Sequence, residues 1–286
     1  MSSRISEVTP QEKPAAGQEL NRIKRLLEEL FSSKAFSFLD TAKSRQKIDA
    51  TMPGTFYLPG NLHPITLVIH EVCSIFQRLG FCAVQGPEVE TEYYNFEALN
   101  IPLDHPARDS FDTFYLDNGR LLRSQTSTVQ IRVIEKARPP VKIIAPGKVF
   151  RPDATDATHS FMFHQIEGLM IDEDVNFAHL KGVLFAFAEE FFGEGTKVRF
   201  RPHFFPFTEP SAEMDVDTPV LRGTGWLEIL GAGMVHPNVL KKMKLDSEKF
   251  TGFAFGMGVE RLAMLKYGIE DIRQFCENDM RLLKQF

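Results

Sequence analysis

The spacing of apolar residues predicts a series of helices and strands in the part of the chain that follows residue 60. Apolar positions recur every three or four residues in "HPITLVIHEVCSIFQRLGF", which predicts a helix from about Pro64 to Leu79 that is stopped by Gly80. A second apolar helix, "FAHLKGVLFAFAEEFF", is closed by Gly193 and Gly195. Strands are predicted in "FCAVQGPEVE", "PVKIIAPGKVFR", "FMFHQIEGLMID", "KVRFRPHFFPF" and "GWLEILGAGMV", while "FTGFAFGMGVERLAMLKYG" predicts a strand, a glycine turn and a helix. Strands joined through hairpins, with helices between some of them, favour an α+β fold built on an antiparallel sheet.

The amino-terminal part of the chain has a different pattern, and the chain is expected to divide into residues 1–50 and 51–286. Residues 1–17 are rich in Ser, Pro, Glu and Gln and are expected to be disordered. The segment "ELNRIKRLLEELFSS" then predicts a helix with one apolar stripe, which either packs on its own domain or forms half of a coiled-coil hairpin. A Pro/Gly-rich connector follows, "DATMPGTFYLPGNLHP". The stripe consists of Leu20, Ile23, Leu27 and Leu30.

Composition narrows the class of protein. With 43% hydrophobic residues the chain can bury a sizeable core, while no apolar run is long enough to cross a membrane and no signal-peptide core precedes the helix. The net charge of −5 excludes attraction by the whole chain as the basis of nucleic-acid binding, which requires a local basic surface or a partner. Cys73, Cys82 and Cys276 have no metal-binding spacing and are expected to be reduced, buried thiols of a cytoplasmic protein.

One predicted strand carries polar residues where apolar ones are expected. Because side chains alternate along a strand, Phe163, Gln165 and Glu167 share one of its faces. An amide beside a carboxylate suits a small cation such as a ligand ammonium group, and Phe163 suits stacking on a flat ring. Arg151 lies across the predicted hairpin, and its planar guanidinium suits a phosphate. The face predicts either a site for a phosphate, an aromatic ring and an amine, or a solvent-facing strand with ordinary polar residues.

A second segment, "GFAFGMGVERL", favours the first of these interpretations. It puts Gly256 and Gly258 at a strand-to-helix junction and Arg261 in the first helical turn. Glycines there let a nucleotide approach the backbone, and an arginine at a helix start suits anions. A glycine turn with a surface arginine is common by itself, whereas F-R-x-D, F-H-Q-x-E and G-x-G-x-E-R in this order form a far more specific set.

These motifs resemble those of the class II aminoacyl-tRNA synthetases, and within them the alpha-subunit family of bacterial-type phenylalanyl-tRNA synthetases. The helix, strand and Pro87 are similar to the family's motif 1, "VFRPDATDATHSFMFHQIEGL" to motif 2 and "FGMGVERL" to motif 3. "NFEALNIPLDHPARDSFDTFYL", "LLRSQTS", "FFPFTEPSAEMDV", "GMVHPNVL" and the ending "DIRQFCENDMRLLKQF" resemble this subunit in particular. The resemblance extends from "LPGNLHPI" to Phe286 and implies a class II synthetase catalytic domain with an antiparallel sheet flanked by helices.

The resemblance also implies roles for individual residues. Arg151 and Arg261 would be catalytic, contacting the α-phosphate of ATP and the far end of its triphosphate. Glu209 would bind Mg²⁺, with further ligands from a beta subunit. The ATP-binding residues would be Arg151, Asp153, Phe163, Gly256, Gly258 and Arg261. The phenylalanine-binding residues would be Gln125, Ser127, Gln130, His159, Gln165, Glu167, Phe205, Phe207 and Ala254, of which Ala254 forms the floor of the ring pocket.

The implied function is ATP-dependent activation of L-phenylalanine and transfer of the phenylalanyl group to tRNA(Phe), with a beta subunit in an (alpha–beta)₂ heterotetramer. A substrate carboxylate is ionised at neutral pH and can attack the α-phosphate directly, so no catalytic base is needed. Members of the family begin with a longer helical hairpin that reaches tRNA, so the resemblance implies that this helical arm is shortened here. Two alternatives are an adenylate-forming relative with a non-tRNA acceptor and a catalytically inactive scaffold subunit. The apolar helix that begins at Pro64 is expected either to need covering by the beta subunit or to be wholly internal.

Overall fold

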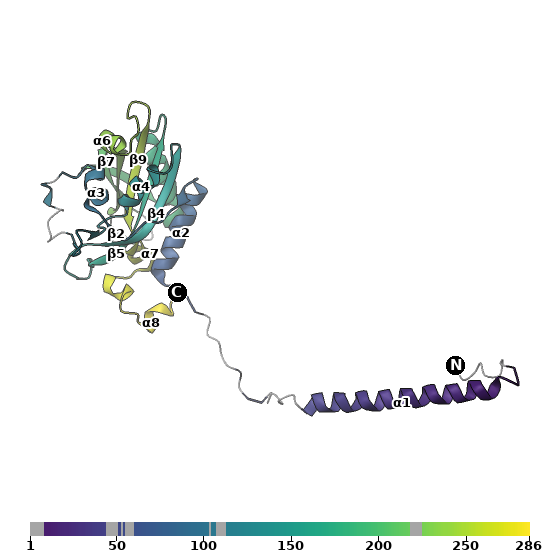
Figure 1. Ribbon diagram of the computed structural model, residues 1–286. Helices are drawn as coiled ribbons and strands as arrows, with labels where there is room; N and C mark the ends of the chain where they lie inside the picture. Colours follow the sequence, from purple (N-terminus) through teal and green to yellow (C-terminus); the bar gives the residue numbers. More distant parts are fainter. Residues whose placement is uncertain are drawn as a thin grey trace. The chain divides into compact units, whose positions relative to one another are not determined.

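The computed structural model describes residues 9–43, 51–52, 54, 60–102, 104–106, 113–217 and 225–286, with no description of the side chains of residues 35–43. The chain forms two compact units, residues 1–59 and residues 60–286 (Figure 1). In the first unit a single long helix, α1 (Lys13–Lys43), is described. Residues 13–17, expected to be disordered, belong to this helix, and residues 1–8 lie outside the described part of the chain.

The apolar stripe of α1 is largely exposed. Ile23, Leu27 and Leu30 expose 37%, 61% and 58% of their surface, and the neighbouring Phe31 exposes 81%. Along the described ranges of the chain, no helix has both the length and the apolar character that a membrane span requires. The helix therefore carries an apolar face that its own described unit does not cover.

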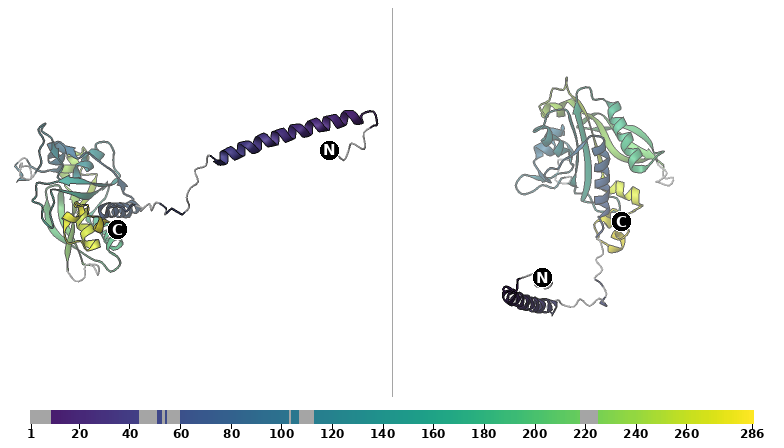
Figure 2. Two further views of the ribbon diagram at one scale, coloured as in Figure 1. Left: turned by 90° about the horizontal axis from the view of Figure 1, so that it is seen from below. Right: turned by 90° about the vertical axis from the view of Figure 1, so that its right-hand side faces the viewer.

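The larger unit is built on a seven-stranded sheet with the strand order β1-β4-β5-β9-β8-β7-β6 (Figures 1 and 2). Strand β1 runs parallel to β4, and all other neighbouring strands are antiparallel. The sheet is therefore mixed, whereas a purely antiparallel sheet was expected. A separate two-stranded ribbon pairs β2 (Val89–Glu90) with β3 (Leu121–Leu122). The strands of the main sheet are β1 (Cys82–Ala83), β4 (Val141–Phe150), β5 (Met162–Asp172), β6 (Lys197–Phe205), β7 (Thr208–Asp217), β8 (Leu227–Val235) and β9 (Thr251–Gly258).

Helices cover both faces of this sheet and enclose two hydrophobic cores. One core joins the sheet to α2 (Pro64–Arg78), α5 (Phe177–Phe192) and α7 (Val259–Tyr267), and Phe76 lies at its centre, stacked on Phe187 and Phe255 at centroid distances of 5.2 and 4.9 Å. The other core lies on the opposite face. It is covered by α3 (Glu92–Asn95), the 3-10 helix η2 (Glu97–Leu99), α4 (Ser127–Ile134) and α6 (Pro237–Lys242), while η5 (Ile272–Phe275) and α8 (Met280–Leu283) end the chain.

Strand β5 connects the two cores because its side chains alternate between them. Ile166 is fully buried in the core beneath α2, α5 and α7, and Leu169 is fully buried in the core on the α4 side. This alternation follows from the period of two in a strand. It puts Phe163, Gln165 and Glu167 on the α4 side, where the candidate site lies.

Several sequence predictions are confirmed and others are wrong. The expected helices over Pro64–Arg78 and Phe177–Phe192 are present, and Ile65, Val68, Val72, Ile75 and Phe76 of α2 are buried against the chain's own core. Strand β7 and helix α4 were not predicted. Cys82 and Cys276 are exposed and Cys73 is half-buried, so the expectation of buried thiols is wrong.

Candidate functional site

The β4–β5 hairpin assembles the first group of predicted site residues. In its register, Phe163, Gln165 and Glu167 face Val149, Gly147 and Ala145 of β4. The loop joining the strands begins at Arg151, whose backbone N–H donates to the carbonyl of Phe161 at 3.0 Å. The three side chains line one cavity together with Arg151, as the alternation along the strand predicts.

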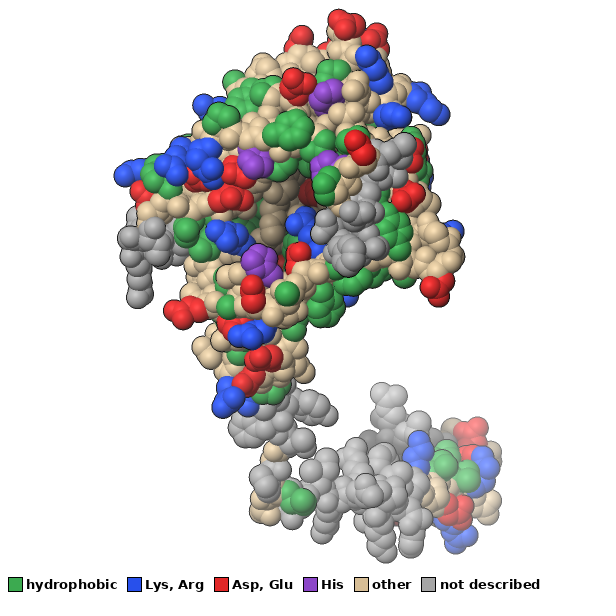
Figure 3. All heavy atoms as spheres, turned by 90° about the vertical axis from the view of Figure 1, so that its left-hand side faces the viewer, with side chains coloured by type: hydrophobic (Ala, Val, Ile, Leu, Met, Phe, Trp, Pro, Cys, Tyr) green, Lys and Arg blue, Asp and Glu red, His purple; other side chains and the backbone are tan. Residues whose placement is uncertain are grey.

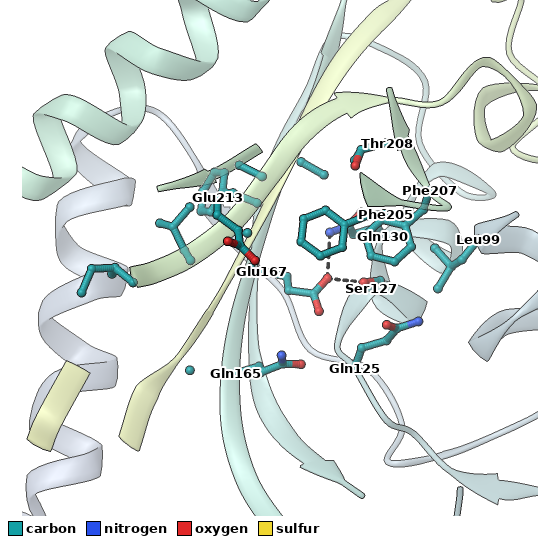
Figure 4. Close-up of a pocket in the computed structure, with 18 of the residues that line it drawn as sticks. Leu99, Gln125, Ser127, Gln130, Gln165, Glu167, Phe205, Phe207, Thr208 and Glu213 are labelled. Atoms are coloured by element: carbon teal, nitrogen blue, oxygen red, sulfur yellow. Dashed lines mark hydrogen bonds between the residues drawn. The ribbon is translucent and has the colours of Figure 1, made fainter. Parts of the chain in front are cut away.

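This first cavity has a volume of about 340 Å³ and reaches across the sheet from β5 to β8. Its polar end carries Gln125, Gln165 and Glu167, and its apolar end carries aromatic rings and small aliphatic side chains (Figure 4). The wall includes these predicted residues: Gln125, Ser127, Gln130, Arg151, Phe163, Gln165, Glu167, Phe205, Phe207, Ala254, Gly256, Gly258 and Arg261.

Glu167 is the buried charge of this cavity, with 6% of its surface exposed. Its carboxylate accepts from the backbone N–H of Thr126 at 3.1 Å, from the side-chain amide of Gln130 at 3.2 Å and from the hydroxyl of Ser127 (Figure 4). All three donors come from the start of α4. Burial raises the pKa of Glu167, and these hydrogen bonds together with the nearby Arg151 oppose the rise.

Gln165 offers a second acceptor beside Glu167. Its buried Oε1 atom has no hydrogen-bond partner among the residues that the structure describes. A buried amide oxygen without a donor is costly, and a donor-rich ligand group removes that cost. An amide oxygen and a carboxylate on the same strand face are suited to an ammonium group, which has three donors and no acceptor.

The apolar end of the first cavity is formed by two stacked rings. Phe205 and Phe207 lie with their centroids 5.7 Å apart and their planes 10° apart. Phe205 fits because Gly231 faces it: a Cβ atom at residue 231 would lie 2.7 Å from the Phe205 ring. Ala254 completes this end with a single methyl group, so the space beyond the rings is apolar.

A second cavity, of about 560 Å³, adjoins the first. The two share Arg151, Phe163, Glu228, Gly258 and Arg261 in their walls. Asp153 and His159 line the second cavity but not the first. One face of the larger unit is hollowed, with basic, acidic and histidine side chains around the rim of the hollow (Figure 3).

Arg151 stands where the cavities meet. Its Nε donates to the carbonyl of Ser124 at 3.2 Å, and its guanidinium lies 5.1 Å from the centre of the Phe163 ring. Burial lowers the pKa of Arg151, while Asp153 and Glu167 oppose that change. The segment that carries Ser124 is itself fixed by the preceding Arg123, which is buried and donates to the carbonyls of Gly86, Pro87 and Lys148.

Arg261 lies in the first turn of α7, and its Nε donates to the carbonyl of Glu228 at 2.8 Å. The two glycines before it have different surroundings. A Cβ atom at residue 256 would lie 3.0 Å from Cγ of Glu167, so Gly256 leaves room for the carboxylate side chain. At Gly258 the nearest atom would be 4.0 Å away, so this glycine leaves open space on the wall of both cavities.

Neither Glu209 nor His159 lines the first cavity. Glu209 lines neither of the two joined cavities: it lies in a different groove, with its carboxylate 3.2 Å from His236 and 73% exposed. Phe205 and Thr208 separate this groove from the first cavity, since both residues line each of them. His159, expected among the phenylalanine-binding residues, lines the second cavity and not the first; it is 61% exposed and lies 3.0 Å from Asp156.

Sequence reasoning missed Glu228, which lines both cavities beside Arg261. The sequence could have indicated this residue, because Glu228 is the single charged residue of the otherwise mostly apolar strand predicted in "GWLEILGAGMV". Leu99 and Glu213 also line the first cavity and were not predicted. Their positions depend on how distant segments pack, which no local pattern shows.

The chain matches the family model of the class II core domain of tRNA synthetases (F) over residues 47–286. It is 54% identical to the phenylalanine–tRNA ligase alpha subunit of Caldanaerobacter subterraneus subsp. tengcongensis, over 99% of this chain and 87% of that protein. It is 52% identical to the subunit of the same name from Francisella tularensis, over 100% of this chain and 88% of that one.

The chain belongs to the class II aminoacyl-tRNA synthetases, among the phenylalanine–tRNA ligase alpha subunits. Pyrrolysyl-tRNA synthetase from Desulfitobacterium hafniense has a similar fold, with a TM-score of 0.59 at 16% identity over 91% of this chain and 84% of that one. The predicted class II synthetase fold is thereby confirmed. Within this fold, the buried Glu167 lies in the first cavity on the α4 side of the main sheet, and the second cavity extends from there to α7 and η5.

The raised pKa of Glu167 predicts a pH-dependent contribution to stability. The folded chain retains the proton at pH values where an unfolded chain has lost it, so this stabilisation is complete below the ordinary Glu pKa and is lost as pH rises through the raised pKa. Glu167→Gln has no such proton. The free energy of unfolding of the unsubstituted chain should therefore fall with pH relative to this variant, by ~1.4 kcal/mol for each unit of pKa difference.

Denaturant unfolding at a series of pH values measures this difference. Glu194→Gln, which replaces an exposed glutamate, is the matched control and should show no pH trend of this kind. A difference between Glu167→Gln and the unsubstituted chain that is constant with pH would contradict the assignment.

Proposed function

We propose that this chain is the catalytic alpha subunit of a phenylalanine–tRNA ligase, which uses ATP to form phenylalanyl-adenylate and transfers the phenylalanyl group to tRNA(Phe). The observation that supports it is the pair of joined cavities, one ending in stacked phenylalanine rings and the other between Phe163 and Arg261. Each cavity has the chemistry of one substrate, and Arg151 stands where the two substrates would react.

The first cavity would hold L-phenylalanine. Its ammonium group would be bound by the acceptors on Glu167 and Gln165, while Ser127 and Gln130 keep the Glu167 carboxylate in place. The substrate ring would extend toward Phe205 and Phe207, whose parallel rings suit stacking or edge contacts with a third ring. Ala254 would limit the length of the ring, and Gln125 would lie near the polar end of the substrate.

The second cavity would hold ATP. Phe163 would stack on adenine, with Asp153 and His159 near it, and the open space at Gly258 lets a nucleotide approach the backbone. Arg151 would contact the α-phosphate and Arg261 the far end of the triphosphate. A planar guanidinium provides paired donors for phosphate oxygens, which a lysine does not.

This arrangement needs no general base. The substrate carboxylate is ionised at neutral pH, so its oxygen attacks the α-phosphorus and pyrophosphate leaves. The work of the chain is to align the two reactants and to stabilise charge on the phosphoryl oxygens and on the departing pyrophosphate. Transfer then moves the phenylalanyl group from the adenylate to a hydroxyl of the terminal ribose of tRNA, with release of AMP.

We propose that Mg²⁺ accompanies ATP and that Glu209 is a ligand shared with a beta subunit. Glu209 brings one exposed carboxylate, and among the described residues no three His, Cys, Asp or Glu side chains gather into a metal-binding group. A lone carboxylate fits a shared site, since Mg²⁺ retains water and takes few protein ligands. Bound there, the ion would supply positive charge for oxygen ligands at the subunit boundary.

The observations favour this function over the two alternatives. A scaffold subunit has no use for a buried carboxylate and two arginines around joined cavities. A relative with another acceptor would still form the adenylate, so ATP–pyrophosphate exchange with each amino acid, followed by aminoacylation of tRNA(Phe), separates all three. Exchange without aminoacylation would favour the other acceptor, and absence of exchange would favour the scaffold.

Substrate selection provides the first prediction from this function. We expect phenylalanine to be activated in preference to tyrosine, because the apolar floor at Ala254 leaves a buried hydroxyl without a partner at a cost of ~1–3 kcal/mol. Ala254→Gly should admit para-substituted rings by removing one methyl group. Exchange rates with phenylalanine, tyrosine and para-chlorophenylalanine measure both effects, and equal activation of tyrosine by the unsubstituted enzyme would refute the assignment.

The position of Arg151 predicts a loss of rate without a loss of fold. Arg151→Ala should lower the rate of adenylate formation ~10²-fold or more, because one preorganised charge contact to the reacting phosphate is removed. Arg151→Lys should recover little of this rate, since a point charge does not replace the planar fork. Arg281→Ala, which removes a 91% exposed arginine on α8, is the control and should leave the rate unchanged. Normal exchange by Arg151→Ala would remove this residue from the mechanism.

We propose that the chain works in a complex with a beta subunit, as a pair of alpha–beta dimers. The support is local: Leu67 of α2 stays half-buried, and Phe204, on the wall of the groove that holds Glu209, is 76% exposed. Sedimentation of the full chain with and without the beta subunit from the same genome should show assembly and a gain of exchange activity. A well-behaved, fully active monomer would contradict this proposal.

A further inference from the structure

His164 faces away from the two cavities and contacts the residue that precedes Arg261. Its backbone N–H donates to the carboxylate of Glu260 at 3.0 and 2.9 Å, and its Nδ1 lies 2.7 Å from Oε1 of the same group. A carboxylate oxygen accepts, so Nδ1–H is the donor. Glu260 is 6% exposed and the His164 side chain 21%, so water screens this pair little.

The pair connects the two elements that would hold opposite ends of ATP. His164 follows Phe163 on β5, and Glu260 precedes Arg261 at the start of α7. Strand β5 already pairs with β9, but their register ends at Gln165 and Gly258. Beyond that point the contact of His164 with Glu260 continues the connection toward Phe163 and Arg261. The Arg261 guanidinium is held separately, through Nε, by the carbonyl of Glu228.

We propose that His164 and Glu260 form a positioning pair that sets the separation between the Phe163 ring and the Arg261 guanidinium, and so determines the affinity for ATP. The proposal rests on the proposed function, since it takes Phe163 as the adenine contact and Arg261 as the triphosphate contact. His164 is a positioning residue and not a catalytic one, because its side chain lines neither cavity, whereas its partner Glu260 also lines the second cavity.

The amino-acid half of the site has an independent support. Glu167 is held by Thr126, Ser127 and Gln130, all at the start of α4. Neither His164 nor α7 takes part in those hydrogen bonds. Loss of the pair should therefore weaken ATP binding and leave phenylalanine binding unchanged, which a general loss of stability would not do.

The same helix provides a matched control. Lys266 of α7 forms an ion pair with Glu71 of α2 at 2.5 Å, with 28% and 35% of these side chains exposed. This pair also fixes α7, but it ties the helix to α2 and not to β5. Lys266→Met should lower the free energy of unfolding with no change in the affinity for ATP.

The experiment compares His164→Leu, His164→Asn, Glu260→Gln and Lys266→Met in the full chain, assembled with its beta subunit. Asparagine keeps a donor near the position of Nδ1, whereas leucine removes it. We expect His164→Leu to raise the KM for ATP in the exchange assay about 10-fold or more, since a hydrogen bond to a charged group is lost. His164→Asn should recover most of that affinity, Glu260→Gln should be intermediate, and the KM for phenylalanine should stay within about twofold in all four.

Calorimetric titration of each variant with a non-hydrolysable ATP analogue tests the positioning pair separately from the proposed function. Absence of exchange by the unsubstituted complex would refute the proposed function, while weaker binding of the analogue by His164→Leu would still support the pair. An unchanged affinity for ATP in His164→Leu would overturn the proposal for this pair. A loss of affinity in His164→Asn or in Lys266→Met as large as that in His164→Leu would also overturn it. Should His164→Leu fail to fold, His164→Ala takes its place, and an affinity for ATP equal to that of His164→Asn would overturn the proposal; Glu260→Gln cannot take this place, because Glu260 lines the second cavity.

Discussion

The burial of the Glu167 carboxylate is the constraint on which the arrangement of the site depends. An ionised carboxylate taken from water costs several kcal/mol unless hydrogen bonds or a positive charge compensate. Here the start of α4 provides three donors, and α4 is in turn fixed by Arg132, which pairs with the buried Glu90 at 2.6 Å. The burial still raises the pKa of Glu167, so these donors compensate only in part. A bound ammonium group would complete the compensation, so the desolvation that makes the buried carboxylate costly would also favour ligands that carry an amine.

The site arginines are oriented in a way that preserves their charge. Arg151 donates to the carbonyl of Ser124, and Arg261 donates to the carbonyl of Glu228. A neutral carbonyl fixes the direction of a guanidinium without cancelling its positive charge. Arg199 and Arg201 differ, because both pair with the carboxylate of Asp215 at 2.7 and 2.6 Å. The first arrangement leaves charge available for a phosphate, and the second consumes it in holding two strands together.

The sequence predicted those parts of the molecule that depend on local periodicity, and it failed where distant segments meet. Alternation along residues 162–172 was enough to identify the polar face of β5, and helical spacing was enough to identify α2. Strand β7 was missed because "TEPSAEMDVD" combines a proline with four acidic residues, which hides its pairing with β6 and β8. The family resemblance implied an ATP-binding role for Gly256, whereas the structure puts it on the wall of the first cavity alone, where it leaves room for Glu167, and this is visible only when β5 and β9 are paired.

Because a strand has a period of two, β5 places its cavity-facing residues and its core-facing residues alternately along the same eleven positions. Gln165 and Glu167 face the cavity, while His164 contacts α7 and Ile166 fills the core beneath it. A slip of one residue in the register would exchange these two sets, burying the polar groups in the core and moving Ile166 to the cavity. The packing that stabilises the sheet is therefore also what keeps the carboxylate and the amide at the site. Substitutions in this core should thus be able to alter ligand affinity without touching the cavity wall.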